Sequence, residues 1–373
     1  MTNKRILLFL LSPVILILLS SWGYLGHQKI NGGITIILPQ EMAFLIPGWT
    51  DIVRLHASDA DYRKETDPDE APRHYIDIDN YPEFLETGMI HHNLDTMIAL
   101  YGYSFVLDQG ILPWATVTAY DSMVACIARL NWNRAGLFAA DLGHYVGDGH
   151  MPLHLTRNYN GQYTGQSGVH SRYESKMVGR YEDQLNIVPD SCQYIGNVKE
   201  FIFTYIYANY QYVDSILLAD QEAATIAGNT VSDLYYGTLW EHTGAFTREL
   251  FQKGSRALAS LIYTGWIEAG SPHIDPNGLE EPEANQGIIL LPPHPNPAVD
   301  QITFTVTIIL PEITFSIRIY DATGRIVTTI ADTILPAGTY RYDWHPDRQG
   351  GGVCYCVLEA GGSYQVRELI FSE

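Results

Sequence analysis

The chain has 373 residues, of which 46% are hydrophobic and 17% are charged, so it is long enough for two globular domains and shows no sign of wholesale disorder. Its formal net charge of -20 at pH 7 argues against nonspecific binding to nucleic acid or anionic membranes through a basic surface. An acidic protein can still contain a locally positive metal site, because divalent ions can outweigh the carboxylates that hold them.

The first segment, residues 1–21, has the pattern of a secretory signal peptide. Lys4 and Arg5 form its charged start, an apolar run follows, and small serines end it. The apolar run is too short for a comfortable membrane span. We therefore expect cleavage before Trp22 and a secreted or cell-surface protein. A retained membrane anchor is the alternative, since Leu19 suits a cleavage site poorly.

From Trp22 onward the hydrophobic period is mostly helical, which predicts a mainly α-helical domain over 22–274. Residues 275–286 contain Pro, Gly and Glu with few apolar residues, a composition typical of a linker, which we expect over 275–292. The clearest predicted helical segments are 115–130, 134–146, 198–219 and 245–269.

Export would permit disulfides among the four cysteines of the chain. Cys354 and Cys356 are two residues apart on a predicted strand and cannot easily pair with each other. A disulfide between Cys126 and Cys192 is left open.

Residues of metal-ligand type are concentrated between positions 144 and 174. Two of the intervals are His-x-x-x-Asp and His-x-x-x-Glu, and a step of four residues places both side chains on one face of a helix. Neutral imidazole and ionised carboxylate are ligands for zinc and similar divalent ions, so this spacing predicts a metal cluster. The residues concerned are His144, Asp148, His154, His170 and Glu174.

Further residues of the same type lie upstream. His74 occurs in Arg-His-Tyr-Ile-Asp, Asp61 in Ala-Ser-Asp-Ala-Asp-Tyr-Arg, and His27 in Trp-Gly-Tyr-Leu-Gly-His. With these motifs, the region from Trp22 to about His273 resembles the bacterial zinc-dependent phospholipases C and the fungal single-strand-specific zinc nucleases. The ligands recur in the same order and at close intervals.

The resemblance implies three Zn²⁺ ions held close together. It assigns the first ion to Asp61, His74, His144 and Asp148, and the second to His154, His170 and Glu174. It assigns the third to His27, to Asp148 as a bridge, and to the amine and carbonyl oxygen of Trp22. That amine can ligate only if cleavage leaves Trp22 first in the chain.

Such a cluster suits hydrolysis of a phosphodiester, which needs a nucleophile, neutralised oxygens and a stabilised leaving alkoxide. Two ions can lower the pKa of a shared water and supply hydroxide, while the third withdraws charge from the leaving oxygen. Asp61 can orient that water or accept its proton, and Asp148 bridges two ions. We therefore predict a zinc-dependent phosphoric-ester hydrolase.

Neighbouring polar residues compete with some of these assignments. Asp59 is an alternative to Asp61, but Asp61 matches the pattern better because Tyr and Arg follow it. His150 has no matching ligand role, so we interpret it as structural or as support for the ligands. His242, in Trp-Glu-His, is a candidate for lining the cleft.

Two features bear on the substrate. Glu174 ends its motif as in the phospholipases, whereas the nucleases usually have Asp there, so we favour a phospholipase C-like enzyme. The start at Trp22 is closer to the nucleases, which makes a single-strand-specific endonuclease the first alternative. Tyr75 and Asp77 follow His74, where the nuclease relatives stack a base and bond its edge. The phospholipases also carry an aromatic there, so the pair does not decide the substrate, and packing of Tyr75 in the cleft wall is the alternative. A non-catalytic secreted surface protein with a structural metal site is the second alternative.

After Pro293 the pattern changes to short alternating runs separated by turns, which predicts an antiparallel β-sandwich over 293–373. The predicted strands are 301–308, 314–320, 325–330, 339–344 and 352–358. The motifs His-Pro-Asn-Pro-Ala, Ile-Tyr-Asp-Ala-Thr-Gly-Arg, Ala-Gly-Thr-Tyr and Arg-Glu-Leu-Ile-Phe resemble the C-terminal sorting domains of type IX secretion substrates in the Bacteroidetes group. They also resemble related immunoglobulin-like modules of secreted bacterial enzymes. The resemblance implies anchoring or contact with secretion machinery, and a plain accessory sandwich is the alternative.

Overall fold

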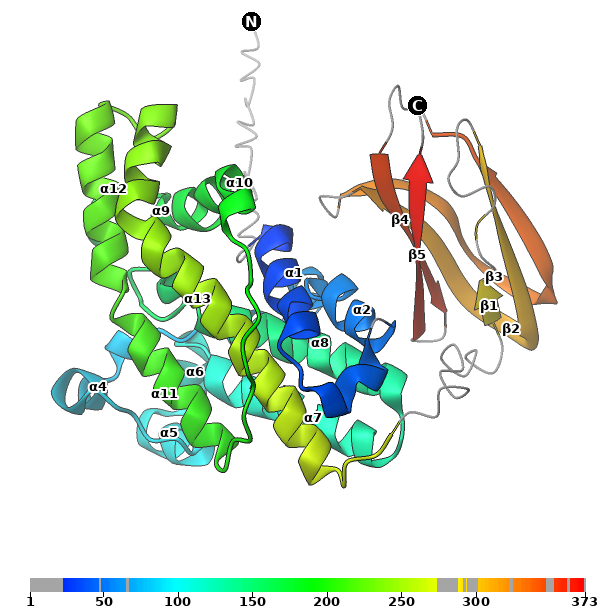
Figure 1. Cartoon of the computed structure of the whole chain (residues 1–373), viewed down its shortest axis with the longest axis horizontal. Coiled ribbons are helices and arrows are strands. Elements are labelled where there is room, and N and C mark those ends of the chain that lie inside the picture. Colours follow the sequence, from blue (N-terminus) through cyan, green and yellow to red (C-terminus); the bar gives the residue numbers. More distant parts are fainter. Residues whose placement is uncertain are drawn as a thin grey trace, which may run out of the picture.

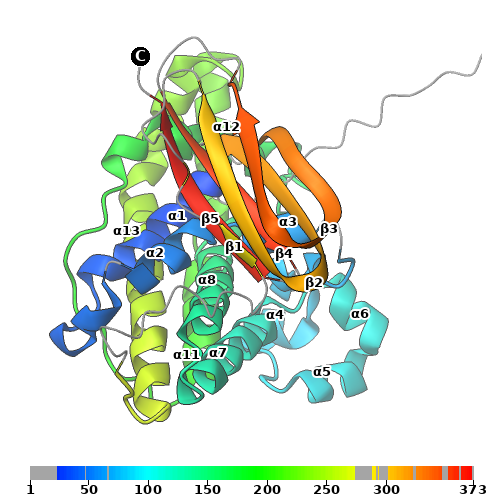
Figure 2. The same cartoon turned by 90° about the vertical axis from the view of Figure 1, so that its right-hand side faces the viewer.

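The chain forms a helical part followed by a strand-rich part, which confirms the predicted fold class of a mainly α-helical domain and a small antiparallel sheet domain. Figure 1 shows the two side by side, and in Figure 2, turned by 90°, the sheet lies in front of the helices. Trp22, the expected leader over 1–21 and most of the expected linker lie outside the described residues. The computed structural model describes residues 23–46, 48–64, 67–273, 288–290, 293, 301–321, 325–346, 352–360 and 363–371.

The helical part contains both long helices and short helical turns. The α-helices are α1 (Gly23–Gly33), α2 (Gly48–Leu55), α3 (Asp59–Arg63), α4 (Pro82–Thr87), α5 (Leu94–Tyr101), α6 (Tyr103–Asp108), α7 (Leu112–Ala128), α8 (Trp132–Gly149), α9 (Val169–Ser171), α10 (Val178–Arg180), α11 (Val198–Tyr210), α12 (Val213–Ala227) and α13 (Asp233–Glu268). The 3₁₀ turns are η1 (Ile34–Ile36), η2 (Gln40–Leu45), η3 (Ala71–His74), η4 (Ile78–Asn80), η5 (Pro152–His154) and η7 (Glu182–Gln184), and η6 (Arg172–Met177) is a π-helix.

The predicted helical segments coincide with α7, α8, α11 to α13, with two differences. The segment 198–219 was expected to be continuous, but it breaks at residues 211 and 212 into α11 and α12, and no Gly or Pro marks that break. Helix α13 starts earlier than predicted, because the Ser232 hydroxyl caps it by accepting from the Tyr235 amide. None of the helices in the described part of the chain is long and apolar enough to cross a membrane.

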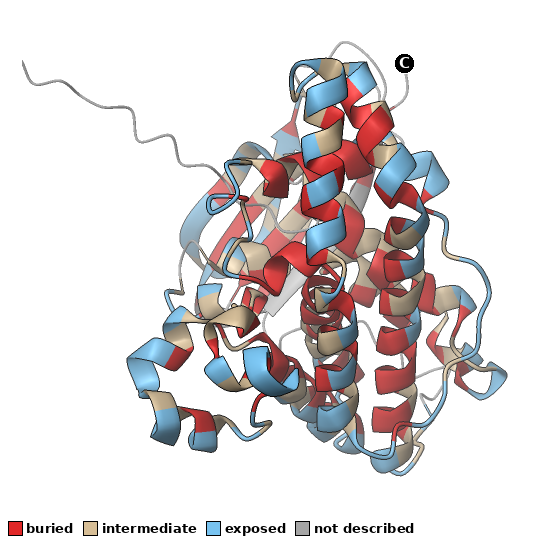
Figure 3. Ribbon diagram, turned by 90° about the vertical axis from the view of Figure 1, so that its left-hand side faces the viewer, coloured by how far each residue is buried: buried red, intermediate tan, exposed pale blue. Residues whose placement is uncertain are grey.

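Buried side chains line the faces that the helices turn toward one another, and exposed ones cover the outer surface (Figure 3). Helix α1 packs closely on α8 at Gly143 and Gly147, which are one turn apart. An added Cβ at Gly143 would lie 2.2 Å from the Asn31 side-chain oxygen, and one at Gly147 would lie 2.9 Å from His27 Nδ1. The Asn31 amide also donates to the Val53 carbonyl at 2.9 Å. These glycines therefore let α1 bring His27 against α8.

The C-terminal part is an antiparallel sheet in which β3 and β4 both pair with β2. The predicted runs 301–308 and 314–320 join into one long strand, because a register shift between Ile308 and Glu312 lets the ladder continue through the expected turn. Buried positions change from even to odd numbers across that shift, which keeps one apolar face. The strands are β1 (Ile288–Leu290), β2 (Ile302–Asp321), β3 (Ile326–Trp344), β4 (Gly352–Ala360) and β5 (Ser363–Phe371).

All four cysteines are free, so the pairing of Cys126 with Cys192 that the sequence left open does not form. Cys354 and Cys356 are buried on the same face of β4, as their spacing of two residues requires, and they pack into the core of the sheet.

Candidate metal centre

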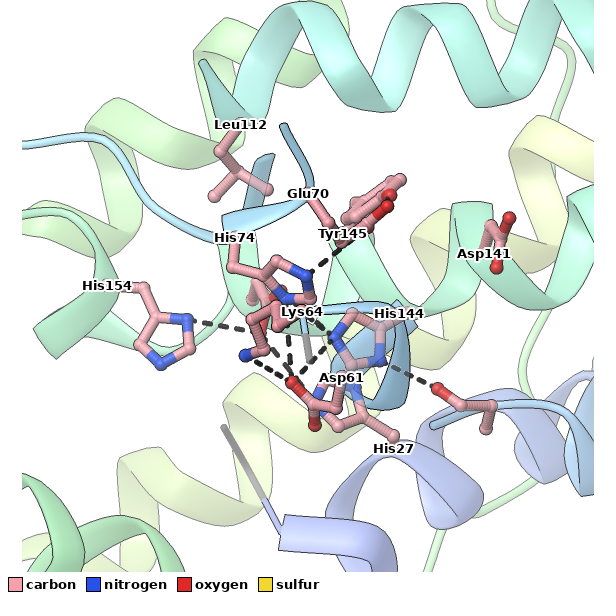
Figure 4. Close-up of polar contacts among 12 residues, drawn as sticks. His27, Asp61, Lys64, Glu70, His74, Leu112, Asp141, His144, Tyr145 and His154 are labelled. Atoms are coloured by element: carbon pink, nitrogen blue, oxygen red, sulfur yellow. Dashed lines mark hydrogen bonds and ion pairs between the residues drawn. The ribbon is translucent and has the colours of Figure 1, made fainter. Parts of the chain in front are cut away.

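Eight of the predicted ligands meet at one place inside the helical part, although they come from widely separated segments. Figure 4 shows His27, Asp61, His74, His144 and His154 among them. Helix α8 contributes two of them on one face, as the four-residue spacing predicts. The others come from short turns and helix ends, which place side chains without long elements of their own. They are His27 from α1, Asp61 from α3, His74 from η3, His144 and Asp148 from α8, His154 from η5, His170 from α9 and Glu174 from η6.

The four ligands expected for the first ion face a common point. His74 Nδ1 lies 3.0 Å from His144 Nε2 and 3.1 Å from Asp148 Oδ2, and His144 Nε2 lies 3.3 Å from the same oxygen. Asp61 Oδ1 lies 3.6 Å from each of those histidine nitrogens. Ligands on a tetrahedral zinc ion at about 2.0–2.1 Å are about 3.3 Å apart. The spacing therefore fits one shared ion.

The second group consists of His154, His170 and Glu174. His154 Nε2 lies 3.3 Å from His170 Nε2, which lies 2.6 Å from Glu174 Oε2. The step from His170 to Glu174 was expected on an α-helix, but it crosses from α9 into the π-helix η6 and still brings the two side chains together. Three protein ligands leave a coordination position for water or substrate, which is typical of catalytic zinc sites.

Asp148 connects these two groups with His27. Its Oδ1 lies 3.1 Å from His154 Nδ1 and 3.7 Å from His27 Nε2. Asp148 is therefore central among the ligands, in the position expected of a bridge. The other donor assigned to the third ion, Trp22, lies outside the described residues.

The donor set passes a test of fit to divalent metal. Asp148 Oδ1 and both carboxylate oxygens of Glu174 are buried and make no hydrogen bond of good geometry, although histidine nitrogens lie 3.1 to 3.7 Å from Asp148 Oδ1 and 2.6 to 3.7 Å from the Glu174 oxygens. A buried carboxylate is costly unless it is paired or coordinates a metal. Imidazole and carboxylate without cysteine suit zinc in a reactive site better than in a closed structural one.

Burial and neighbouring charges keep Asp148 and His27 in the protonation states that bind a metal ion. Burial would raise the pKa of Asp148, but the surrounding histidines, first His144 and then His154, lower it well below the usual value, so it remains a carboxylate. Burial lowers the pKa of His27 well below its usual value and keeps it neutral. Burial alone would lower the pKa of His144, but Asp148 and Asp61 raise it to about 9. A metal ion would have to displace that proton.

The ring nitrogens that do not face the cluster are held by oxygen atoms. His144 Nδ1 lies 2.7 Å from the Ala57 carbonyl, and His170 Nδ1 lies 3.2 Å from the Tyr159 carbonyl. His74 Nε2 lies 3.4 Å from the Glu70 carboxylate. Such contacts orient metal-binding histidines and set their tautomer.

Glu70 was missed in the sequence, where the Glu-x-x-x-His spacing to His74 was the available signal. It is fully buried. Arg63 Nε donates to its carboxylate at 3.1 Å, and the Tyr145 hydroxyl donates to the same carboxylate. Burial would raise its pKa, but hydrogen bonds from His74, Tyr145 and Arg63 lower it to about 2. Glu70 is therefore a charged carboxylate fixed behind a ligand.

Glu70→Gln is expected to weaken zinc binding by about 10- to 100-fold, the usual cost of losing such support. The amide keeps the size of the side chain but loses the negative charge that holds the His74 ring. Competition with a chelator measures the zinc affinity. Glu182→Gln is the control, because Glu182 is an exposed acid paired with Lys29. An unchanged zinc affinity in Glu70→Gln would show that Glu70 does not support the His74 ligand.

Lys64 also lies at the cluster and was not identified from the sequence. Its Nζ lies 2.5 Å from Asp61 Oδ1, and its charge acts on both His144 and His154 by lowering their pKa values. It is one helical turn after Asp61, a spacing that marks it only once Asp61 is known to be in the site. It places a cation beside the Asp61 carboxylate.

The competing residues lie elsewhere. Asp59 pairs with His56 at 2.6 Å, so Asp61 rather than Asp59 reaches the cluster. His150 donates through Nδ1 to the Val146 carbonyl at 2.7 Å and stacks on a tyrosine, a structural role. His242 is exposed and lies 3.5 Å from Glu222.

Tyr75 and Asp77 lie beyond η3, on the segment that follows His74. The Tyr75 hydroxyl donates to the Asp108 carbonyl at 3.3 Å. Burial raises the pKa of Tyr75, with further contributions from Asp77, Asp108 and Tyr159. Burial raises the pKa of Asp77 to about 7, assisted by Asp79. An aromatic ring therefore lies close to a carboxyl group whose pKa is about 7.

No protein-family model matches the chain, and no curated protein sequence matches it. Among solved structures, the chain is similar to the alpha-toxin of Clostridium absonum, with a TM-score of 0.43 and 10% identity over 95% of this chain and 98% of that chain. Its similarity to the alpha-toxin of an avian strain of Clostridium perfringens has a TM-score of 0.42 and 10% identity, again over 95% and 98%. At these TM-scores the likeness is no argument for a function. Any argument for a function therefore has to come from the residues of the site.

Proposed function

We propose that the protein is a trinuclear zinc-dependent phosphoric-ester hydrolase, phospholipase C-like, that cleaves a phosphodiester. The observation that carries the proposal is the spacing of Asp61, His74, His144 and Asp148, whose donor atoms lie 3.0 to 3.6 Å apart, as suits donors around one ion. Burial of the set and the second group beside it support more than one ion. A closed structural site would not need so many carboxylates.

Bound zinc would supply an activated water and neutralise the phosphoryl oxygens. The side chains of the chain then have separate tasks. Asp61 orients the attacking water or accepts its proton, because it lies at the edge of the cluster with a side-chain exposure of 14%. Lys64, beside it, faces a phosphoryl oxygen. The bond from phosphorus to the leaving oxygen breaks, and the products are an alcohol and a phosphomonoester.

Lys64→Met is expected to lower kcat by about 10²- to 10³-fold, the usual cost of removing one donor to developing negative charge. Zinc content should stay at the wild-type value, because an ammonium group cannot ligate a metal. Initial rates and metal analysis on the same sample measure both. Lys29→Met removes the same charge from a lysine paired with Glu182 and should leave kcat unchanged. Equal kcat in the two variants would exclude the role of Lys64.

The phospholipase C-like choice rests on the ligand motif that ends in Glu174. A single-strand-specific zinc endonuclease is the second candidate, and Tyr75 with Asp77 favours it. An aromatic ring can stack on a base, and an adjacent carboxyl can bond the edge of that base. The same pair could also contact a cationic head group, through the ring face and the carboxylate.

Phosphatidylcholine and single-stranded DNA should be offered side by side to zinc-loaded protein that begins at Trp22, with and without chelator. We expect chelator-sensitive release of diglyceride. Release of nucleotides instead would favour the endonuclease. Release of neither by protein that contains zinc would contradict both candidates and favour a non-catalytic protein with a structural metal site.

The pH dependence of KM discriminates further, because the pKa of Asp77 is raised to about 7. Its carboxyl is neutral below that pH and charged above it, so attraction of a choline head group is gained as pH rises. KM for phosphatidylcholine should therefore fall through pH 7, and Asp77→Asn should remove that fall. A diester without a cation, bis(p-nitrophenyl) phosphate, is the control. A fall that persists in Asp77→Asn would exclude this contact.

We also propose that the chain is exported, cleaved before Trp22, and sorted or anchored through its sheet domain. Cleavage at that bond frees the amine that the third ion requires. Amino-terminal sequencing of the protein from the culture medium tests this, and an uncleaved leader would contradict both export by cleavage and the third ion.

A further inference from the structure

Arg172 lies between two ligands of the second metal group, His170 and Glu174, and its side chain is fastened on the opposite side. Residues two apart on a helix point in nearly opposite directions, so the ligands face the cluster while Arg172 faces α12 and α13. Its Nε donates to Asp220 Oδ1 at 2.9 Å and its Nη2 to Asp220 Oδ2 at 3.0 Å. Arg172 and Asp220 are 8% and 1% exposed.

Further donors of this guanidinium are also used. Nη1 donates to the Ser167 carbonyl at 2.8 Å, and Nη2 donates to the Gln166 carbonyl at 3.0 Å. Nε also lies 3.0 Å from the Tyr235 hydroxyl on α13. One side chain thus joins α12, α13 and the loop before α9.

Gly168 provides independent evidence that the position of Arg172 matters. Its φ of +92° lies in the left-handed region, and an added Cβ would lie 2.9 Å from Arg172 Nη1. Gln166, two residues before it, donates to Asp220 Oδ2 at 2.9 Å. The loop is therefore shaped around the guanidinium.

The ligand segment needs such support. Helix α9 has only three residues, and the π-helix that follows it is a form that occurs in short pieces, often at functional sites. Neither element is long enough to fix its own direction, so contacts with other parts of the fold have to do so. The buried pair holds the segment at the residue midway between the two ligands, and the hydroxyl of the next residue, Tyr173, lies 2.9 Å from Thr247 Oγ1 on α13.

We propose that the Arg172–Asp220 pair is a positioning device that sets His170 and Glu174 for metal binding. The proposal rests on the proposed zinc-dependent function. Metal sites require ligands within about 0.5 Å of their working positions, and loss of a supporting contact usually weakens metal affinity by about 10- to 100-fold. The forked geometry matters as well as the charge, because only arginine presents two parallel donors to a carboxylate.

Three variants test the pair. Arg172→Lys keeps the charge and loses the fork, and Asp220→Asn removes the acceptor charge. The double variant Arg172→Met with Asp220→Asn removes both buried charges, so it stays informative where an unpaired charge prevents folding. Arg180→Lys is the matched control. Arg180, on the following helix α10, donates to Asp233 Oδ1 on α13 at 2.7 Å, but this pair is exposed to solvent. His170→Ala provides the reference for a lost ligand.

Zinc stoichiometry and affinity are measured by chelator competition, and melting temperature is recorded with and without zinc. In the three variants we expect about one zinc per chain to bind about 10- to 100-fold more weakly than in the wild type. The loss should be smaller than in His170→Ala, and the affinity for the other ions should not change. The zinc-dependent rise in melting temperature should shrink.

Wild-type affinity in every folded variant would overturn the proposal. So would an equal fall in melting temperature with and without zinc, since that is the result of a merely structural pair. Absence of zinc from the wild-type protein would contradict the proposed function instead, which separates the two failures.

Discussion

Asp148→Asn is expected to lower kcat/KM for phosphodiester hydrolysis by about 10³-fold or more, since several kcal/mol of charge stabilisation depend on the ions that this residue is proposed to bridge. Its carboxylate lies within 3.1 to 3.7 Å of His27, His74, His144 and His154. The neutral amide keeps the shape but cannot offer an anionic oxygen to each of two ions. Steady-state rates with both candidate substrates, at saturating zinc, measure the loss.

The control is an acid of the same type outside the cluster. Asp121→Asn removes one charge from the exposed surface of α7 and should leave kcat/KM unchanged. Full activity in Asp148→Asn would contradict the whole assignment of the cluster. Partial activity with normal zinc content would show that the bridge is dispensable for one of the ions.

Removal of metal should lower the melting temperature of the helical part by roughly 8–16 °C. Zinc at 1,000 times its dissociation constant stabilises the folded state by about 4 kcal/mol, and each kcal/mol corresponds to about 2–4 °C in a domain of this size. The physical reason is that Asp148 Oδ1 and both carboxylate oxygens of Glu174 are buried and face histidine nitrogens without a hydrogen bond of good geometry. Without a cation these groups destabilise the core.

Scanning calorimetry before and after treatment with chelator, followed by return of zinc, measures this shift and its reversal. Magnesium at the same concentration is the control, because it prefers oxygen ligands in octahedral geometry and suits imidazole poorly. Identical melting temperatures with and without chelator would argue that the protein holds no ion, whatever the spacing of its ligands.

Much of the site could be predicted, because many of its ligands lie at characteristic intervals within short segments of the sequence. The four-residue step from His144 to Asp148 has one meaning on a helix, and α8 has the face that the step requires. Asp61 could be preferred over Asp59 from the two residues after it, and Asp59 indeed turns to His56. The change to alternating runs near Pro293 likewise predicted the sheet.

Other residues had a weak local signal or none. Glu70 has only its four-residue spacing to His74, and its buried charge is tolerated because Arg63 compensates it and the Tyr145 hydroxyl of a distant helix donates to it. The Ala57 carbonyl that holds His144 is a backbone atom, which no side-chain motif can indicate. The break between α11 and α12 likewise lacks the Gly or Pro that would have marked it.

The sequence by itself determined the kind of chemistry, because the types of residue and their spacing along short segments decide which ligands are available. Tertiary structure decided which of those ligands meet and how they are held. Arg172 illustrates the difference: in the sequence it is a charged residue between two ligands, and in the fold it bonds to Asp220 of α12. A contact of that range depends on the packing of whole helices, whose relative positions no local pattern specifies.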